Sequence, residues 1–133
     1  MSAAVLDTSA LIALLRGHEA VARASRELDR IVVPVVVLGE LLVGRVGAGR
    51  GARGEREVRA VVASPRVEVA ALGVETAERY AVIRQGLRRA GRPVPANDIW
   101  IAASAMEQGL LVLTLDRHYL EIPQILVELF EPA

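Results

Sequence analysis

Four carboxylic acids in this chain stand where an acid is costly or where two secondary-structure segments meet. Asp7 follows the apolar run "AAVL", Asp116 follows "LLVLTL", and Asp98 opens the alanine-rich segment "NDIWIAASAMEQG". Glu40 has only apolar residues and glycine for at least four positions on either side. An ionised carboxylate in apolar surroundings is unfavourable unless it is paired or binds a metal. These residues are therefore the first candidates for a functional site.

Each of these acids also has a purely structural explanation. Asp7 and Asp98 could cap helices, a role that stabilises a helix by about 1 kcal/mol. Asp116 could be a turn residue, and Glu40 could form an ion pair with an arginine. Taken together, however, like charges brought to one place repel each other unless a cation lies between them. The set therefore predicts a metal site.

The residue types available restrict the metal and its chemistry. The chain has no cysteine and two histidines, so carboxylate oxygens must dominate the ligand set. Oxygen ligands favour Mg²⁺, with Mn²⁺ as the second choice. Such a cation suits phosphate chemistry, because it neutralises the substrate and lowers the pKa of a bound water. No nucleophilic triad is evident: His18 follows a predicted helix end, and His118 lies in the turn after Asp116. We expect His118 to be a solvated turn residue, with a catalytic contribution as the alternative.

The segments that must position these acids alternate between strand and helix patterns. We expect strands at 3–6, 30–34, 67–72, 110–115 and 124–130. We expect helices at 10–17, 19–29, 35–44, 55–64, 74–91 and 97–109, with the five-glycine stretch 44–54 as a loop or a frayed helix end. This alternation predicts a three-layer α/β fold, in which helices cover both faces of a mostly parallel sheet of about four or five strands. Such folds bind ligands beside the carboxyl ends of their strands.

Length and composition indicate one globular domain over residues 1–133. Apolar residues make up 53% of the chain and charged residues 24%, and no apolar run approaches the roughly 18 residues of a membrane span. Asp7 interrupts the N-terminal apolar stretch, so we expect a cytoplasmic protein without a secretion signal. Sixteen basic residues, all arginine, balance sixteen acidic ones, so net charge does not indicate a polyanionic partner. The four aromatic residues are too scattered to predict a base-stacking surface.

The motifs that hold the four acids resemble those of a known family. The segments "VLDTSALIALL", "VVVLGELLVG", "PANDIWIAASA" and "LLVLTLDRHY" together resemble the PIN domain, and within it the VapC-type ribonuclease toxins of bacterial toxin–antitoxin pairs. The resemblance covers essentially the whole chain. It implies that Asp7 and Asp98 bind the metal directly, whereas Glu40 and Asp116 bind it directly or through water.

The resemblance also assigns supporting roles to nearby polar residues. Thr8, Ser9 and Thr114 are expected to hold the carboxylates in place. Asn97 is expected either to cap its helix or to contact the scissile phosphate. The implied reaction is Mg²⁺-dependent, endonucleolytic hydrolysis of single-stranded RNA by metal-activated water. The implied partners are a VapB-type antitoxin, which forms a heterocomplex with the toxin, and a second copy of the chain in a homodimer.

Arginine side chains are the candidates for binding the RNA. Four of them lie at the end of one predicted helix and at the start of the segment "RPVPAND", with several on one helical face. We expect them to contact substrate phosphates, with a solvated helix end as the alternative: Arg84, Arg88, Arg89 and Arg92. The motif "GRGARG" at 49–54 formally matches G-x-G-x-x-G, but the segment before it reads as a helix rather than the required strand. A flexible loop, a phosphate contact and an antitoxin contact remain open for that stretch.

Two other functions are compatible with parts of the sequence. A catalytically silent PIN-like module that binds protein or RNA would have no reason to retain a repulsive cluster of four acids. A phosphohydrolase acting on small phosphoesters commonly needs a lysine beside a nucleophilic aspartate, and this chain has no lysine. The RNA target is not predictable from these patterns.

Overall fold

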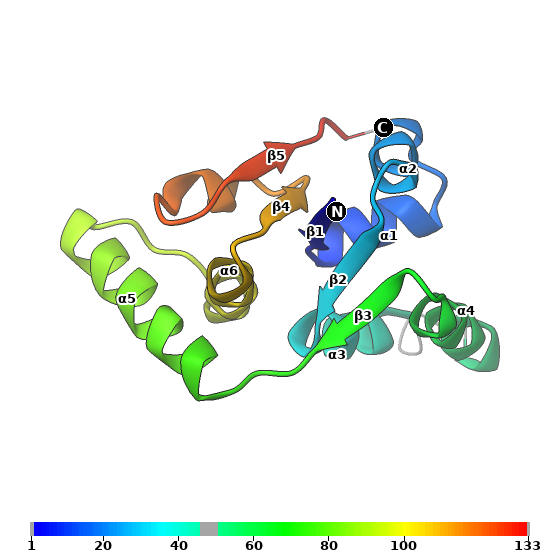
Figure 1. The fold of residues 1–133 in the computed structure, drawn as a ribbon, viewed down its shortest axis with the longest axis horizontal. Coiled ribbons are helices and arrows are strands. Elements are labelled where there is room, and N and C mark those ends of the chain that lie inside the picture. The colour runs from blue at the N-terminus through cyan, green and yellow to red at the C-terminus, as the bar shows by residue number, and fades with distance from the viewer. Residues whose placement is uncertain (1, 46–50, 133) are drawn as a thin grey trace.

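Five parallel strands form the central sheet of the structure, a computed structural model that describes residues 2–45 and 51–132. The strands are β1 (Ala3–Leu6), β2 (Arg30–Pro34), β3 (Val67–Ala70), β4 (Leu111–Thr114) and β5 (Val127–Leu129). Their order in the sheet is β3-β2-β1-β4-β5, and every neighbouring pair is parallel (Figure 1). The predicted α/β class and the parallel sheet are confirmed.

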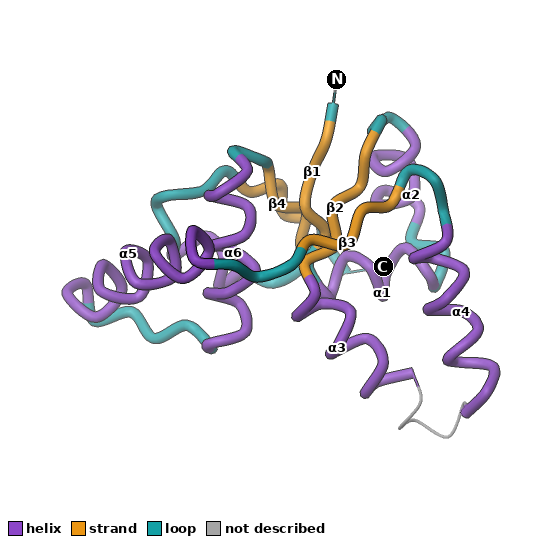
Figure 2. The backbone as a smooth tube through the Cα atoms, turned by 60° about the horizontal axis from the view of Figure 1, so that its bottom comes forward, coloured by secondary structure: helices purple, strands orange, loops and turns teal. Residues whose placement is uncertain are grey.

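Within the described residues, six α-helices and one 3₁₀ helix connect the strands. They are α1 (Thr8–Leu15), α2 (Glu19–Arg26), α3 (Val35–Arg45), α4 (Gly51–Ala63), α5 (Val74–Ala90), α6 (Ala96–Gln108) and the 3₁₀ helix η2 (Arg117–Glu121). In Figure 2, α5 and α6 lie to one side of the strands and α1, α2, α3 and α4 lie to the other. Within the described ranges, no helix has the length and apolar character needed to cross a membrane.

Apolar packing between the sheet and the helices on both of its faces forms the core, and α6 contributes the most buried residues of any helix. The inner strands are almost fully buried, which agrees with the continuous apolar runs that parallel strands require when helices cover both faces. Six successive or near-successive residues of α6 are also buried, among them Ala102, Ala103 and Ala105. These small side chains allow α6 to approach the sheet closely while α5 packs on its other side. The core therefore holds the N-terminus of α6 at a defined place beside the strands.

The largest differences from the predicted elements concern α4, β5 and η2. Helix α4 begins at Gly51, so residues 51–54 are helical rather than part of a loop, and Gly54 is buried in it. Packing of α4 against α3 overrides the low helix propensity of glycine there; the rest of the glycine-rich stretch, 46–50, lies outside the described residues. Strand β5 has three residues where seven were expected, because only that part pairs with β4. Helix η2 was not predicted.

The topology explains why the acids meet. The chain order runs from β1 through β2 to β3 in one direction, and β4 and β5 lie on the other side of β1. The boundary between β1 and β4 is therefore the switch point, where parallel α/β sheets open a crevice at the carboxyl ends of their strands. Asp7 follows β1 and Asp116 lies two residues after β4, so both stand at that edge.

Candidate metal centre

Asp7 is the most buried of the four acids, with 3% of its surface exposed. It caps α1, accepting a 2.8 Å hydrogen bond at Oδ1 from the backbone N–H of Ala10. The hydroxyl of Ser9 lies 2.8 Å from the same oxygen, and the hydroxyl of Thr114 donates to Oδ2 at 2.6 Å. Burial raises the pKa of Asp7, and the hydrogen bonds from Thr114, Ala10 and Ser9 oppose that rise. Ser9 Oγ also lies 3.0 Å from Oδ2, so both oxygens of this carboxylate accept hydrogen bonds.

The two hydroxyls that hold Asp7 also hold the chain that follows β4. The backbone N–H of Leu115 donates to Ser9 Oγ at 2.9 Å, and that of Asp116 donates to Thr114 Oγ1 at 2.9 Å. Each hydroxyl thus joins a carboxylate to the turn that carries Asp116. Ser9 and Thr114 lie where a supporting role requires them, although their contribution to activity stays a prediction.

Asp98 lies in the first turn of α6 and does not cap it. The N-cap residue is Pro95, which makes no side-chain capping hydrogen bond, and the Asp98 carboxylate faces the turn after β4 instead. The hydroxyl of Tyr119 donates to Asp98 Oδ1 at 3.3 Å. Burial and the nearby charges of Asp116 and Asp7 raise the pKa of Asp98 to about 6. The helix-capping explanation is therefore wrong for Asp98, whereas for Asp7 it describes one of several contacts.

Tyr119 was not singled out in the sequence, although it is fully buried beside the acids. Burial, followed by the charges of Asp7 and Asp98, raises the pKa of its phenol, so the hydroxyl stays a neutral donor. An aromatic residue three positions after Asp116 was the only available signal, and the pattern does not tell a packed ring from a hydrogen-bond donor. In the folded protein, Tyr119 is both a packed ring and a hydrogen-bond donor.

Glu40 projects from α3 and joins three helices. Its Oε1 accepts a 2.6 Å hydrogen bond from the Thr8 hydroxyl of α1, and its Oε2 accepts one of 3.3 Å from the Asn97 side-chain amide of α6. Within the described part of the chain, no arginine forms an ion pair with Glu40, so the structural explanation proposed for it is not observed. Asn97 uses its amide on Glu40 rather than as a helix cap.

His118 stands closer to the acids than expected of a solvated turn residue. The Asp116 side chain caps η2 by accepting a 2.9 Å hydrogen bond from the His118 backbone N–H. The His118 side chain is 52% exposed, yet its Nδ1 lies 3.0 Å from Asp116 Oδ1 and 3.9 Å from Asp98 Oδ2. One potential ligand atom from each of these three residues lies within 4.8 Å of the other two. The imidazole is thus part of the cluster.

The cluster fits a divalent cation. Four carboxylates converge, and Asp116, Asp7 and Glu40 each raise the pKa of Asp98 by their charge. Among the described residues, no arginine forms an ion pair with any of the four acids. Carboxylate oxygens with an adjacent imidazole are ligands for Mg²⁺, Mn²⁺ and other borderline cations. Asp98 and Asp116 are the best placed to hold one, because one oxygen of each lies within 4.8 Å of the other and of a His118 ring nitrogen.

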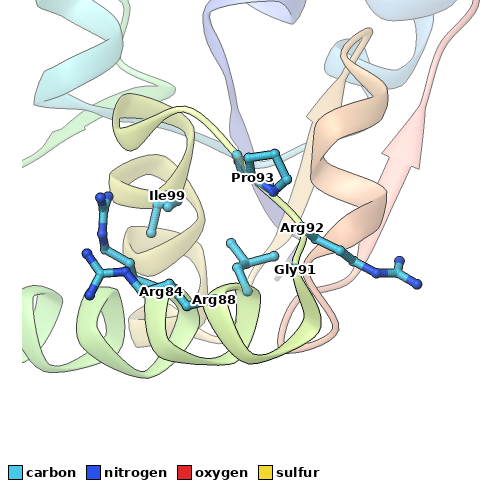
Figure 3. A pocket seen from close by; sticks show the side chains of 8 residues that line it. Arg84, Arg88, Gly91, Arg92, Pro93 and Ile99 are labelled. Carbon is cyan, nitrogen blue, oxygen red and sulfur yellow. The ribbon is translucent and has the colours of Figure 1, made fainter.

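Three of the four candidate arginines border one pocket. This pocket has a volume of about 310 Å³ and lies where α5 runs into α6 (Figure 3); its lining includes Arg84, Arg88, Arg92, Leu87, Val94 and Ile99. Arg89 is exposed but does not line it. Figure 3 shows Arg84 and Arg88 on the same side of the pocket, while Arg92 points away from them and forms an ion pair with Glu121 of η2.

The same helices bring two aromatic rings together. Tyr80 of α5 and Trp100 of α6 stack with their ring centroids 4.1 Å apart. The Arg84 guanidinium lies over Tyr80, 5.8 Å from the ring centroid, and donates to its hydroxyl at 2.9 Å. Tyr80 and Trp100 are 20 residues apart in the sequence, yet they lie at facing positions on adjacent helices.

Comparison with known proteins places this fold and its acidic edge in a defined class. Residues 4–125 match the PIN domain family. Ribonuclease VapC5 of Mycobacterium tuberculosis is 33% identical over 124 residues, which cover 89% of this chain and 86% of that protein. Ribonuclease VapC4 of the same organism is 35% identical over 93 residues, covering 70% and 72% of the two chains. The chain therefore belongs to the PIN domain family, among the VapC ribonucleases.

Solved structures agree with this assignment. VapBC2 from Rickettsia felis, bound to a promoter DNA fragment, superposes with a TM-score of 0.88 at 19% identity, covering 97% of this chain and 99% of that one. VapBC-5 from Mycobacterium tuberculosis, a member of the VapBC family of toxin–antitoxin systems, has a TM-score of 0.75 at 31% identity, covering 99% and 100%. The resemblance identified from the sequence motifs is confirmed.

Proposed function

We propose that this chain is a single-domain, Mg²⁺-dependent endoribonuclease that cleaves single-stranded RNA and acts as the toxin of a VapBC-type pair. The observation that carries the proposal is the convergence of Asp7, Glu40, Asp98 and Asp116 at one sheet edge without an arginine counterion among the described residues. Membership among the VapC ribonucleases supplies the reaction class. Mn²⁺ is the expected substitute for Mg²⁺, since both accept oxygen ligands.

The residues of the site have distinct tasks in this proposal. A bound cation supplies charge neutralisation for the phosphodiester and an acidified water. Asp7, held by Ser9 and Thr114, and Asp98, held by Tyr119, present fixed oxygens to the cation. Asp116 completes the set from the turn after β4. Glu40 remains hydrogen-bonded to Thr8 and Asn97 and orients water at the side of the cluster.

An open groove beside Glu40 is suited to the scissile phosphate. It is lined by Glu40 and Asn97 together with Val36, Gly39, Val43 and Gly44. The two glycines have no heavy atom within 4 Å of where a Cβ would stand, so the space beside them is open. In this arrangement Asn97 reaches both Glu40 and the substrate. Hydrolysis by water is expected to leave a 5′-phosphate and a 3′-hydroxyl.

The arginine pocket is the proposed contact for the RNA backbone. Arg84 and Arg88 lie on one side of it, and the pocket adjoins Ile99, the residue after Asp98. A guanidinium offers paired donors that suit phosphate oxygens. Arg92 is already paired with Glu121 and would have to exchange that partner, whereas Arg89 lies outside the pocket. Arg84 and Arg88 are therefore the stronger candidates of the four.

The proposed protein partners are a VapB-type antitoxin and a second copy of the chain. VapBC-5, whose matched chain is 31% identical to this one, belongs to a family of toxin–antitoxin systems. The antitoxin must bind the toxin in the compartment where the toxin would otherwise cleave RNA. The proposal therefore includes a cytoplasmic location for the chain. An adjacent reading frame for a short DNA-binding protein would support it.

Incubation of total bacterial RNA with the purified, antitoxin-free protein tests the proposal. The comparison uses wild type, Asp98→Asn and Asp29→Asn, with Mg²⁺ and with excess chelator. Asp29 is exposed and lies outside the acidic cluster, so it controls for the same chemical change elsewhere. We expect cleavage that needs both Mg²⁺ and Asp98 and that tolerates Asp29→Asn. A folded protein that cleaves no RNA and binds neither Mg²⁺ nor Mn²⁺ would instead be the silent binding module.

A further inference from the structure

His118 brings a nitrogen donor to a site whose other candidate ligands are oxygens. Its Nδ1 lies 3.0 Å from Asp116 Oδ1 and 3.9 Å from Asp98 Oδ2, although more than half of the side chain is exposed. The other histidine of the chain is engaged elsewhere: His18 Nδ1 accepts from the Val21 backbone N–H at 3.2 Å, and its Nε2 lies 2.8 Å from the Glu131 carbonyl oxygen. His118 is therefore the one imidazole available to the acidic cluster.

The backbone holds this imidazole in place. Helix η2 starts with the Asp116 carboxylate accepting from the His118 backbone N–H, so the residue is tied to Asp116 at its main chain and faces it with its ring. Tyr119, the next residue, is fully buried and anchors the same turn in the core. A histidine that served only as a solvated turn residue would not need its ring directed at two carboxylates.

Ligand type affects which cation a site prefers. Mg²⁺ strongly prefers oxygen ligands, whereas Mn²⁺ and later first-row ions also accept imidazole nitrogen. The three potential ligand atoms of Asp98, Asp116 and His118 lie within 4.8 Å of one another, which is compatible with a single cation. In that role Nδ1 contributes its lone pair and Nε2, on the solvent side of the ring, carries the proton.

We propose that His118 is a nitrogen ligand of the catalytic cation and shifts the preference of the site from Mg²⁺ towards Mn²⁺ and other imidazole-binding ions. This inference rests on the cation site of the proposed function and adds to it the identity of one ligand and the resulting metal selectivity.

Metal binding to the full chain tests the inference directly. Calorimetric titrations with Mg²⁺ and with Mn²⁺ at mildly alkaline pH compare wild type, His118→Asn and Leu120→Ala. Asparagine places an amide oxygen near the former Nδ1, so it keeps a hard donor but removes the nitrogen. Leu120 is an exposed residue of the same 3₁₀ helix and controls for changes in η2. Pulsed electron paramagnetic resonance of the Mn²⁺-loaded proteins reports whether a histidine nitrogen is coordinated.

We expect His118→Asn to weaken Mn²⁺ binding at least about tenfold and Mg²⁺ binding by less than about threefold. It should also abolish the nitrogen coupling in the Mn²⁺ spectrum, and Leu120→Ala should change none of these. Wild-type Mn²⁺ without nitrogen coupling, or equal losses for both ions, would overturn the role of His118 while Asp98-dependent RNA cleavage still stood. A wild-type chain that binds neither ion would overturn the proposed function together with this inference.

Discussion

The hydroxyl of Thr114 donates a 2.6 Å hydrogen bond to Asp7 Oδ2, joining residues that are 107 positions apart in the chain. The bond connects the carboxyl ends of β1 and β4, the two strands at the switch point of the sheet. Both residues are buried, so neither can exchange this contact for one with bulk water.

Thr114→Val should therefore destabilise the protein by about 1–3 kcal/mol, because it leaves a buried carboxylate short of one donor. It should also raise the pKa of Asp7 further, since the lost bond is the largest effect that opposes burial. Urea unfolding in chelator measures the stability. Thr114→Ser keeps the hydroxyl and should recover most of the loss. A Thr114→Val protein as stable as wild type would show that the hydrogen bond contributes nothing to stability.

Tyr119→Phe should distinguish the role of Tyr119 in positioning Asp98 from its role in core packing. The ring stays in the core, so the loss of stability should stay near about 1 kcal/mol. Without the phenol donor, the pKa of Asp98 should rise above its present value of about 6. We expect a higher Mg²⁺ concentration for half-maximal cleavage and an unchanged maximal rate at saturating Mg²⁺. A lower maximal rate with unchanged Mg²⁺ dependence would contradict this assignment.

The raised pKa of Asp98 predicts how the stability of the metal-free protein depends on pH. A carboxyl group with a pKa of about 6 in the folded state and 3.8 in the unfolded state holds its proton more tightly when folded. Its contribution to stability therefore falls as pH rises from about 4 to about 6, by roughly 3 kcal/mol in total.

Thermal unfolding in excess chelator measures this pH dependence. Asp98→Asn should flatten the profile over that interval and unfold at a higher temperature than wild type at neutral pH. Asp29→Asn, at an exposed position, should reproduce the wild-type slope. Identical slopes for wild type and Asp98→Asn would show that Asp98 titrates alike in the folded and unfolded chains.

Arg88 and Arg89 form a matched pair for testing the RNA contact. They are adjacent and both exposed on α5, but only Arg88 lines the pocket. Arg88→Ala should weaken RNA binding and raise KM without changing kcat. It should also reduce the slope of log binding constant against log salt concentration by about 0.7, the value for one phosphate contact on a single strand. Equal effects of Arg88→Ala and Arg89→Ala would indicate that only net charge matters.

Apolar periodicity and residue type in the sequence were sufficient to predict the class of fold and to choose the four acids as candidate site residues. Parallel strands buried on both faces must be short apolar runs, so "AAVL", "RIVVP" and "LLVLTL" were recognisable one at a time. An acid that follows such a strand, or that stands among apolar residues as Glu40 does, is conspicuous for the same reason. These features depend on local sequence. The fold class is confirmed, and the role of the acids in a metal site stays a prediction.

The partners of each side chain depended on the tertiary structure. Asp98 does not cap its helix, because packing of α6 directs its carboxylate towards Tyr119 and His118. Among the described residues, Glu40 pairs with Thr8 and Asn97 rather than with an arginine. Of the four candidate arginines in α5 and just after it, three line a pocket. A sequence pattern specifies which face of a helix or strand is buried, but not which residue packs against it from 20 to 100 positions away. Those contacts form only when the sheet is assembled, and they bring the four acids close enough for their charges to interact.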